Sequence, residues 1–488
     1  MAFSLTNNRT IKALGGVRIF ALILLVQAAL LVMMLADWKL PAALIFGFLT
    51  LIFALRNPLV AIVLLVAGRI LSTGSMSFIR VGGMNIGLFE PMLLLALLVA
   101  AYHAMESKIS LGVRFPWRTP LLVFWCWQAI GLLWAYKASL GLQEWVAVGI
   151  VLATTTLILA FVTDLDRFHV VVRAWVVASV MIGLLSLATS FSDIATSAPT
   201  FEAASGGGRE TGLGQQPNWF AMNLMFGVLT SFAVAMHTPK KFLKVAFALA
   251  GLFIFFAQLR SGSRGGAYAI VIGGGLMALA NPVFRKWMLR FGAVAVALFT
   301  YQIFFGDDST RKALMRIWMN LDTLWRSDIR VRNWVACIEM FQETNGLGIG
   351  AGGYAQVIAD YDWKIYESIH RYPHGIPWGI IGHYGLVGMV CAVWLIVRVA
   401  KMARQLVEWT RGTAVEPFAW AMPATIFAYF AWSVVEFNFD DKPFWEFLAL
   451  YTALYVIVRR RVESGKPLEL DQRMAAPLPW AAPKGESS

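Results

Sequence analysis

Residues 142–163 read LQEWVAVGIVLATTTLILAFVT, an apolar run whose single charged side chain, Glu144, lies near its start. As a helix this run would be about 33 Å long at 1.5 Å per residue, enough to cross a hydrocarbon layer of about 30 Å. Such runs recur along the 488 residues, of which 59% are apolar and 14% charged, with a mean hydropathy of +0.66. Soluble domains carry about 25% charged residues. The sequence therefore predicts an all-α polytopic membrane protein of about 12–14 transmembrane helices with one large extramembrane segment.

The individual spans follow from the same reading of apolar length. We expect them at 16–36, 40–55, 58–72, 86–105, 119–136, 142–163, 168–192, 216–236, 242–259, 264–281, 287–305, 375–399, 414–436 and 443–458. The pair 40–55 and 58–72 is short, and it also fits a re-entrant hairpin or one broken helix. The run 16–36 follows basic residues but precedes no clear small-residue cleavage site, so we interpret it as an uncleaved first span.

Positive charge orients the predicted spans. The formal net charge is +13, and every connection on one side of the alternating topology carries Lys or Arg, from Arg56 through Arg167 and Lys240 to Arg459. The positive-inside rule places that side, and both termini, in the cytoplasm. We expect an N-terminal bundle over 1–305, a large periplasmic segment over 306–374, C-terminal transmembrane helices over 375–461 and a disordered cytoplasmic tail over 462–488. The sequence contains no nucleic-acid-binding motif, so a nucleic-acid partner is not expected.

Two local patterns exclude other classes of site. The three cysteines, Cys126, Cys337 and Cys391, form no CxxC motif and imply neither a disulfide framework nor a thiolate metal site. The stretch from Gly346 to Gly353 matches GxGxxG, but a predicted amphipathic helix over 327–343 precedes it instead of a strand. We expect Ile329, Trp334, Ile338 and Phe341 on the apolar side of that helix, followed by a glycine-rich turn where the backbone approaches another element closely.

Candidate ligand-binding residues cluster at the predicted outer ends of spans. Arg260 and Arg264 flank a short outer turn, Ser-Gly-Ser, and two arginines there favour an anionic ligand such as a phosphate, although anchoring at the interface is the alternative. His374 lies between two prolines where the large segment re-enters the membrane, and a neutral imidazole there has the chemistry of a general base.

Weaker candidates accompany these residues. Asn218 opens a predicted span, where an ordinary N-cap is the alternative, and Glu210 precedes it. The acidic pairs Asp307-Asp308 and Asp440-Asp441 have the ligand type of a divalent cation, but such pairs at span ends are more often solvated. We therefore expect no metal and no other cofactor.

An ordered set of four motifs between about 210 and 390 resembles the O-antigen ligase/polymerase family of bacterial surface polysaccharide assembly. The family's PN span start resembles Pro217-Asn218, and its SRG element resembles Ser263-Arg264-Gly265. Its R-x-x-x-W followed by Gly-x-Gly resembles Arg330 to Trp334 and then Gly348-Ile-Gly350. Its HN motif before a G-x-x-G resembles His374 before Gly385-Leu-Val-Gly388. This chain departs from the pattern in two places, with Gly375 after the histidine and Asn345 before the glycine turn.

The resemblance implies a metal-independent, inverting glycosyltransferase of the bacterial inner membrane. Its donor would be a glycan on undecaprenyl diphosphate and its acceptor a saccharide or lipid A core, within O-antigen or exopolysaccharide assembly. It implies that His374 is the general base, that Arg264 and Arg330 bind the diphosphate, and that Arg332 can substitute for Arg330. Asn218, Glu210 and Arg260 are further substrate-binding candidates.

Other activities stay open at this point. Polymerase, ligase and O-linked transfer to a protein hydroxyl share these motifs. A secondary transporter or flippase of lipid-linked sugars is the alternative from another class, and it would need ionisable groups near the membrane midplane. The charged residues inside predicted spans are few, and all fall near span ends: Arg69, Glu90, Glu144 and Arg173.

Overall fold

The structure is a computed structural model, and it describes residues 39–71, 79–81, 84–86, 89–191, 217–280, 282–306, 311, 314–315, 328–367, 372–434 and 442–468. The predicted first span 16–36 and the tail from residue 469 lie outside these residues. So do Glu210 and both acidic pairs, Asp307-Asp308 and Asp440-Asp441.

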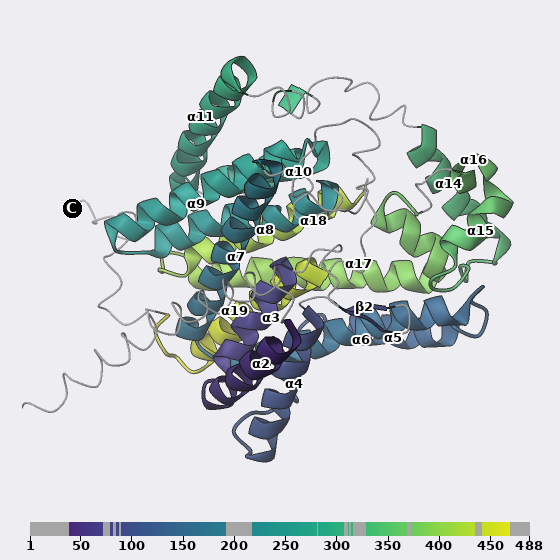
Figure 1. The fold of residues 1–488 in the computed structure, drawn as a ribbon, viewed down its shortest axis with the longest axis horizontal. Helices are drawn as coiled ribbons and strands as arrows, with labels where there is room; N and C mark the ends of the chain where they lie inside the picture. Colours follow the sequence, from purple (N-terminus) through teal and green to yellow (C-terminus); the bar gives the residue numbers. More distant parts are fainter. Residues whose placement is uncertain are drawn as a thin grey trace, which may run out of the picture.

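The described residues form sixteen helices and one antiparallel hairpin (Figure 1). The N-terminal helices are α2 (Lys39–Arg56), α3 (Leu59–Leu71), α4 (Phe89–Met105), α5 (Arg118–Gly131), α6 (Ala138–Phe161), α7 (Leu165–Phe191), α8 (Pro217–His237), α9 (Lys241–Arg260), α10 (Arg264–Ala280) and α11 (Pro282–Phe305). The others are α14 (Asp328–Glu343), α15 (Tyr354–Tyr361), α16 (Trp363–Glu367), α17 (Ile376–Thr410), α18 (Glu416–Ser433) and α19 (Lys442–Glu463). Every predicted span from 40–55 onward coincides with one helix, and the short pair is two separate helices, α2 and α3.

Six of these helices are long and apolar enough to cross a membrane, so the chain is a multi-pass membrane protein. They cover Ala138–Phe161, Leu165–Leu187, Asn218–His237, Lys241–Arg260, Phe284–Phe305 and Ile376–Thr410. Shorter apolar helices lie within α2, α3, α4 and α10.

Several boundaries differ from the expected ones, and the largest difference is in α17, which continues to Thr410 instead of 399. The predicted span 86–105 begins inside the hairpin formed by β1 (Ile79–Val81) and β2 (Met84–Ile86), and α4 starts only at Phe89. Gly82 and Gly83 separate the two strands in the sequence, and a Gly-Gly pair is a typical hairpin connection. The length of the apolar run, from which the span was predicted, does not reveal such a connection. Helix α5 ends at Gly131 instead of 136, because the turn after it carries Trp134, whose Nε1 donates to the carbonyl of Gly348 at 3.0 Å.

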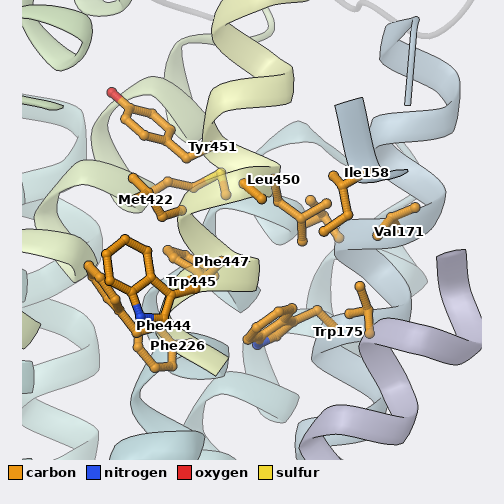
Figure 2. Close-up of a cluster of buried hydrophobic side chains, with 14 of the residues drawn as sticks. Ile158, Val171, Trp175, Phe226, Met422, Phe444, Trp445, Phe447, Leu450 and Tyr451 are labelled. Carbon is orange, nitrogen blue, oxygen red and sulfur yellow. The ribbon is translucent and has the colours of Figure 1, made fainter. Parts of the chain in front are cut away.

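The core is an aromatic cluster shared by α6, α7, α8, α18 and α19 (Figure 2). The ring of Phe447 lies 5.0 Å from that of Phe226 and 5.4 Å from that of Trp175, and Tyr429 stacks on Phe444 at 4.1 Å. Helix α8 is central, because 94% of its apolar stretch is buried. In α11 only 6% of the apolar stretch is buried. The bundle is thus organised around α8, and α11 lies at its edge (Figure 1).

Helix α17 is broken at Gly385, where φ is 62° and ψ is −153°. The break leaves backbone carbonyls without helical partners, and other elements supply the donors. Ile349 N donates to the carbonyl of Gly382 at 3.0 Å, Gly350 N to that of His383 at 3.0 Å, and Trp127 Nε1 to that of Tyr384 at 2.8 Å. On the far side of the break, Leu386 N donates to the carbonyl of Gly346 at 2.9 Å.

The glycine-rich turn approaches other backbone closely, which confirms that expectation. A Cβ on Gly348 would lie 2.5 Å from the carbonyl oxygen of His383, and one on Gly352 would lie 2.5 Å from the carbonyl carbon of Leu140. Gly346, Gly348, Gly350 and Gly352 also have positive φ, where an L side chain is strained. The turn therefore joins the break in α17 to the α5–α6 connection.

Helix α14 confirms the predicted amphipathic helix, but its buried side was predicted only in part, since Ile329, Trp334 and Phe341 are half-buried. Asn333, Ala336, Cys337 and Met340 are buried, whereas Ile338 is exposed. The cause is close packing, since a Cβ on Gly382 of α17 would lie 3.1 Å from the Cβ of Cys337. Small residues allow this approach, and the larger apolar residues flank it.

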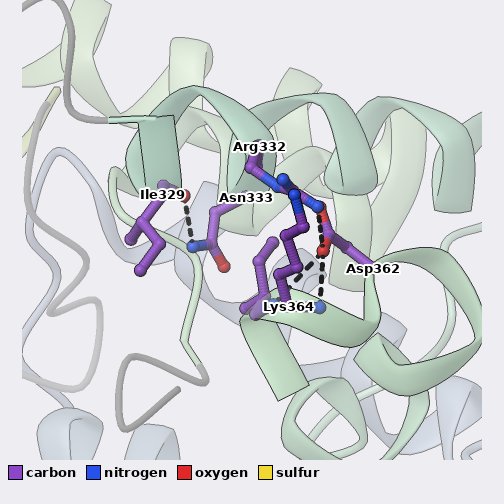
Figure 3. Close-up of polar contacts among 6 residues, drawn as sticks. Ile329, Arg332, Asn333, Asp362 and Lys364 are labelled. Carbon is purple, nitrogen blue, oxygen red and sulfur yellow. Dashed lines mark hydrogen bonds and ion pairs between the residues drawn. The ribbon is translucent and has the colours of Figure 1, made fainter. Parts of the chain in front are cut away.

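A bidentate ion pair joins α14 to the α15–α16 corner (Figure 3). Nε and an Nη of Arg332 each donate to one carboxylate oxygen of Asp362 at 2.5 Å. Asp362 also accepts hydrogen bonds from the backbone N–H groups of Lys364 and Ile365 at 3.0 and 3.2 Å. Burial by itself raises the pKa of Asp362, but the Arg332 bond and charge and the two N–H groups outweigh it and leave that pKa below 3.8.

Replacing Gly385 by Ala is expected to destabilise the protein, because the new Cβ would collide with the carbonyl of Gly346 at a residue held at positive φ. The positive φ alone costs about 1–2 kcal/mol for an L residue. Thermal unfolding in detergent measures the effect. Gly275→Ala in α10 is the matched control, since a Cβ there meets no atom within 4 Å, and Ala favours a helix by up to about 1 kcal/mol. Equal melting temperatures for the two variants would contradict the proposed constraint.

Asp362→Asn is expected to lower the melting temperature at neutral pH by an amount that disappears in acid. A carboxyl whose pKa is depressed by folding stabilises the protein above its unfolded pKa, and that contribution is lost as pH falls through the folded pKa. The difference between wild type and Asp362→Asn should therefore be full at pH 6–7 and close below 3.8. Asp360→Asn, at an exposed neighbouring position, should show no such pH-dependent difference.

Candidate functional site

The turn between α9 and α10 positions the two arginines of the candidate site. Gly262 has a φ of 62°, which lets the chain reverse within Ser261–Ser263. Ser261 Oγ donates to the carbonyl of Gln258 at 2.6 Å, and Ser263 Oγ accepts from Gly266 N at 3.4 Å as an N-cap of α10. Arg260 thus ends α9, buried with 7% of its surface exposed, and half-buried Arg264 opens α10.

The C-terminal end of α18 brings the Arg264 turn next to His374. A Cβ on Gly265 would collide with the indole of Trp432, and a Cβ on Gly375 would collide with the carbonyl oxygen of Val434. Because Trp432 and Val434 are two residues apart, the residues that follow Arg264 and His374 contact the same turn of chain. No sequence signal marked Trp432 or Val434 as part of a site.

The start of α8 joins the same place. A Cβ on Gly266 would lie 2.8 Å from the Cβ of Ala221 and 2.8 Å from Nε2 of Gln258. Ala221 is one helical turn after Asn218, whose side chain is half-buried. The amide of Gln258 is buried with 1% exposed, and neither its nitrogen nor its oxygen has a hydrogen-bond partner in the described structure. This residue was not predicted from the sequence.

His374 is held from the side of α14. Its side chain is buried with 3% exposed, and its ring lies 4.2 Å from that of Tyr372. Its backbone carbonyl accepts a hydrogen bond from Trp334 Nε1, and Trp334 stacks on Trp378 at 5.4 Å. Arg330 lies one helical turn before Trp334, so this half-buried residue is on the same face of α14 as the residue that contacts His374.

The predicted residues thus separate into two groups. Asn218, Arg260, Arg264, Arg330 and His374 belong to elements that meet around the end of α18. Arg332 instead makes the ion pair with Asp362, which occupies its guanidinium fork. Cys337 lies behind α14 as a buried thiol whose pKa burial raises to about 12, so it stays protonated and unreactive at neutral pH.

The arrangement suits an anion. Helices α8, α10 and α17 all begin at this place, and helix N-termini carry partial positive charge and free N–H groups. Arg260, Arg264 and Arg330 add full charges, and His374 adds a proton acceptor beside them. No protein-family model and no curated protein matches this chain at a significant level.

Proposed function

We propose that this protein is a glycosyltransferase that moves a glycan from undecaprenyl diphosphate to a saccharide or lipid A core acceptor. The observation that carries the proposal is that Gly265 after Arg264 and Gly375 after His374 both contact the end of α18, while Trp334, one helical turn after Arg330, contacts the backbone of His374. A donor with two phosphates needs cationic, bidentate groups, and its acceptor needs a base within reach. Polysaccharide ligase and polymerase both fit this chemistry.

The proposal includes a bacterial inner membrane location with 12–14 spans, both termini in the cytoplasm and the site on the periplasmic side. Two features support this orientation. Arg56, Arg167 and Lys240 lie at the ends of α2, α7 and α9 that face away from the Arg264 turn. No nucleotide sugar is available in the periplasm, which makes a lipid diphosphate the natural leaving group there.

In the proposed reaction the acceptor hydroxyl oxygen attacks the anomeric carbon and forms the new C–O bond. The bond from that carbon to the diphosphate oxygen breaks, and its electron pair leaves as undecaprenyl diphosphate. Arg264 and Arg330 stabilise the charge that develops on this oxygen, and the hydroxyl proton passes to His374. Attack opposite the leaving group inverts the anomeric centre. Arg260 at the end of α9 and Asn218 at the start of α8 orient the donor.

The alternative of a transporter loses support from the intramembrane charges. Arg69 pairs with Glu446 at 3.4 Å, and its guanidinium lies 3.1 Å from the centroid of the Phe89 ring. Glu144 accepts a hydrogen bond from Tyr384 at 2.5 Å. These groups hold helices together. Arg173 has no ion-pair partner among the described residues, but it lies at the opposite end of the bundle from the Arg264 turn.

Purified protein in proteoliposomes is expected to form a glycosidic bond from lipid-linked donor and acceptor, and His374→Ala should lower this rate about 10²–10⁴-fold. The affinity for the donor should change little, because the histidine handles the acceptor proton. Arg330→Ala should instead raise the KM for the donor as well, since it removes a phosphate contact. Product analysis by mass spectrometry measures the transfer. Movement of the donor across the bilayer without a new bond would favour the transporter, and full activity of His374→Ala would overturn the base assignment.

Arg264→Lys is expected to lose most of the transfer activity at normal expression. A planar guanidinium grips a phosphate with two parallel N–H groups, whereas an ammonium is a point charge. The glycan profile of cells and the rate in proteoliposomes measure the loss. The same exchange at exposed Arg290 of α11 is the control and should be silent. If Arg264→Lys assembles glycan as well as the control does, Arg264 is an interfacial anchor and no phosphate ligand.

A further inference from the structure

Three side chains capable of positive charge meet at the other end of the bundle. His169 and Arg173 lie one helical turn apart on α7, and His237 is the last residue of α8. The imidazole rings of His169 and His237 stack with centroids 4.1 Å apart and planes at 10°. Both are buried, with 6% and 8% of their surfaces exposed. Phe418 of α18 lies against both rings, at 5.1 and 5.4 Å.

The hydrogen bonding of this cluster is incomplete. His237 Nδ1 donates to the carbonyl of Ala414 at 2.9 Å, which fixes that ring. His169 Nε2 and Arg173 Nε are buried and have no hydrogen-bond partner among the described residues. No carboxylate in the described part of the chain forms an ion pair with Arg173. A buried donor that makes no hydrogen bond costs about 1–3 kcal/mol of stability, and more when it is charged.

The neighbouring acids are engaged elsewhere. Asp164, at the start of α7, pairs with Arg167 at 3.1 Å. Glu416, at the start of α18, accepts a hydrogen bond from Gly412 N at 2.9 Å. Among the described residues, the fixed charge of Arg173 therefore has no compensating acid, and it lies on a helix that spans the membrane, where a guanidinium without an ion-pair partner is costly and marks a functional site.

The depth of the cluster indicates where its ligand comes from. Arg173 is eight residues into α7, about 12 Å from the inner end of that helix, and His169 is about 6 Å from it. Helix α7 is about 40 Å long and exceeds the hydrocarbon layer by about 10 Å in all, so the backbone of Arg173 lies several ångströms inside the boundary between acyl chains and headgroups. Phosphate groups of lipids lie just outside that boundary, within reach of an arginine side chain.

We propose that His169, Arg173 and His237 form a phosphate-binding site at the inner end of the bundle, separate from the candidate active site. The Arg173 guanidinium supplies the planar fork that phosphate oxygens prefer, and His169 Nε2 supplies a further donor once its ring carries a proton there. An anion between the rings and the guanidinium also removes the repulsion that opposes positive charge on stacked imidazoles. The phosphate is that of an inner-leaflet lipid headgroup or a free phosphate, and the experiment distinguishes them.

Thermal unfolding of the full-length protein in dodecyl maltoside, which carries no phosphate, tests this site. Inorganic phosphate is added in one series and phosphatidylglycerol in another, with sodium chloride at matched ionic strength. We expect one of the two probes to raise the melting temperature, and Arg173→Met to weaken that binding at least about tenfold, the equivalent of one charge-assisted hydrogen bond. Arg167→Met is the matched control, because Arg167 lies on the same helix and already pairs with Asp164.

The melting temperature without added ligand is a second test. Arg173→Met should melt at the same temperature as wild type or higher in phosphate-free micelles, because it removes a half-buried charge that has no ion-pair partner among the described residues. A response to phosphatidylglycerol alone identifies a lipid site, and a response to inorganic phosphate identifies a free-anion site. The proposal is overturned if neither probe stabilises wild type, if Arg173→Met responds as Arg167→Met does, or if Arg173→Met is less stable without ligand.

Discussion

The break in α17 at Gly385 determines how α14, α15 and α16 sit on the bundle. Carbonyls freed by the break need donors in a place where water is scarce, and the glycine-rich turn provides two of them through Ile349 and Gly350. Those donors reach the carbonyls only because the turn has no side chains on the contacting glycines. The turn is also the end of α14, so the satisfaction of a few backbone groups fixes α14 and its Arg330 relative to His374 at the start of α17.

The two ends of the bundle treat positive charge differently. At the candidate active site, Arg264 and Arg330 lie in the first turns of α10 and α14, where the helix N-termini add positive potential to the charge of the arginines and favour an anionic ligand. Arg332 shows the contrast within one helix. Its guanidinium donates to the carboxylate of Asp362, which also accepts a hydrogen bond from the backbone N–H of Lys364, so Arg332 is a structural residue. Local sequence cannot separate Arg330 from Arg332, because both carry the same side chain two residues apart. Only the fold of the α15–α16 corner does.

Prediction from the sequence was most successful for segments whose apolar surroundings allow only one backbone structure. The apolar run 264–281 became α10, Arg264–Ala280, and 242–259 became α9, Lys241–Arg260, since a backbone in lipid must form a helix. The prediction failed where the structure depends on contacts between residues that are far apart in the sequence. The buried face of α14 follows from Gly382 and Cys337, and the pairing of Gly265 with Trp432 links residues with no common pattern. The burial of the Gln258 amide was not predicted for the same reason, because its surroundings come from α8 and α10.

Helix α11 has a mechanical consequence. Only 6% of its apolar stretch is buried, and its packed side chains include Phe291, whose ring lies 4.7 Å from that of Phe232 and 5.2 Å from that of Phe255. The stretch after Arg290, residues 291–305, extends about 22 Å as a helix, which is shorter than a hydrocarbon layer of about 30 Å. A helix with that mismatch is accommodated by local thinning of the bilayer or by flanking basic side chains that extend to the headgroups. The lipid beside α11 therefore thins, or Arg285, Lys286 and Arg290 reach along the helix to the headgroups.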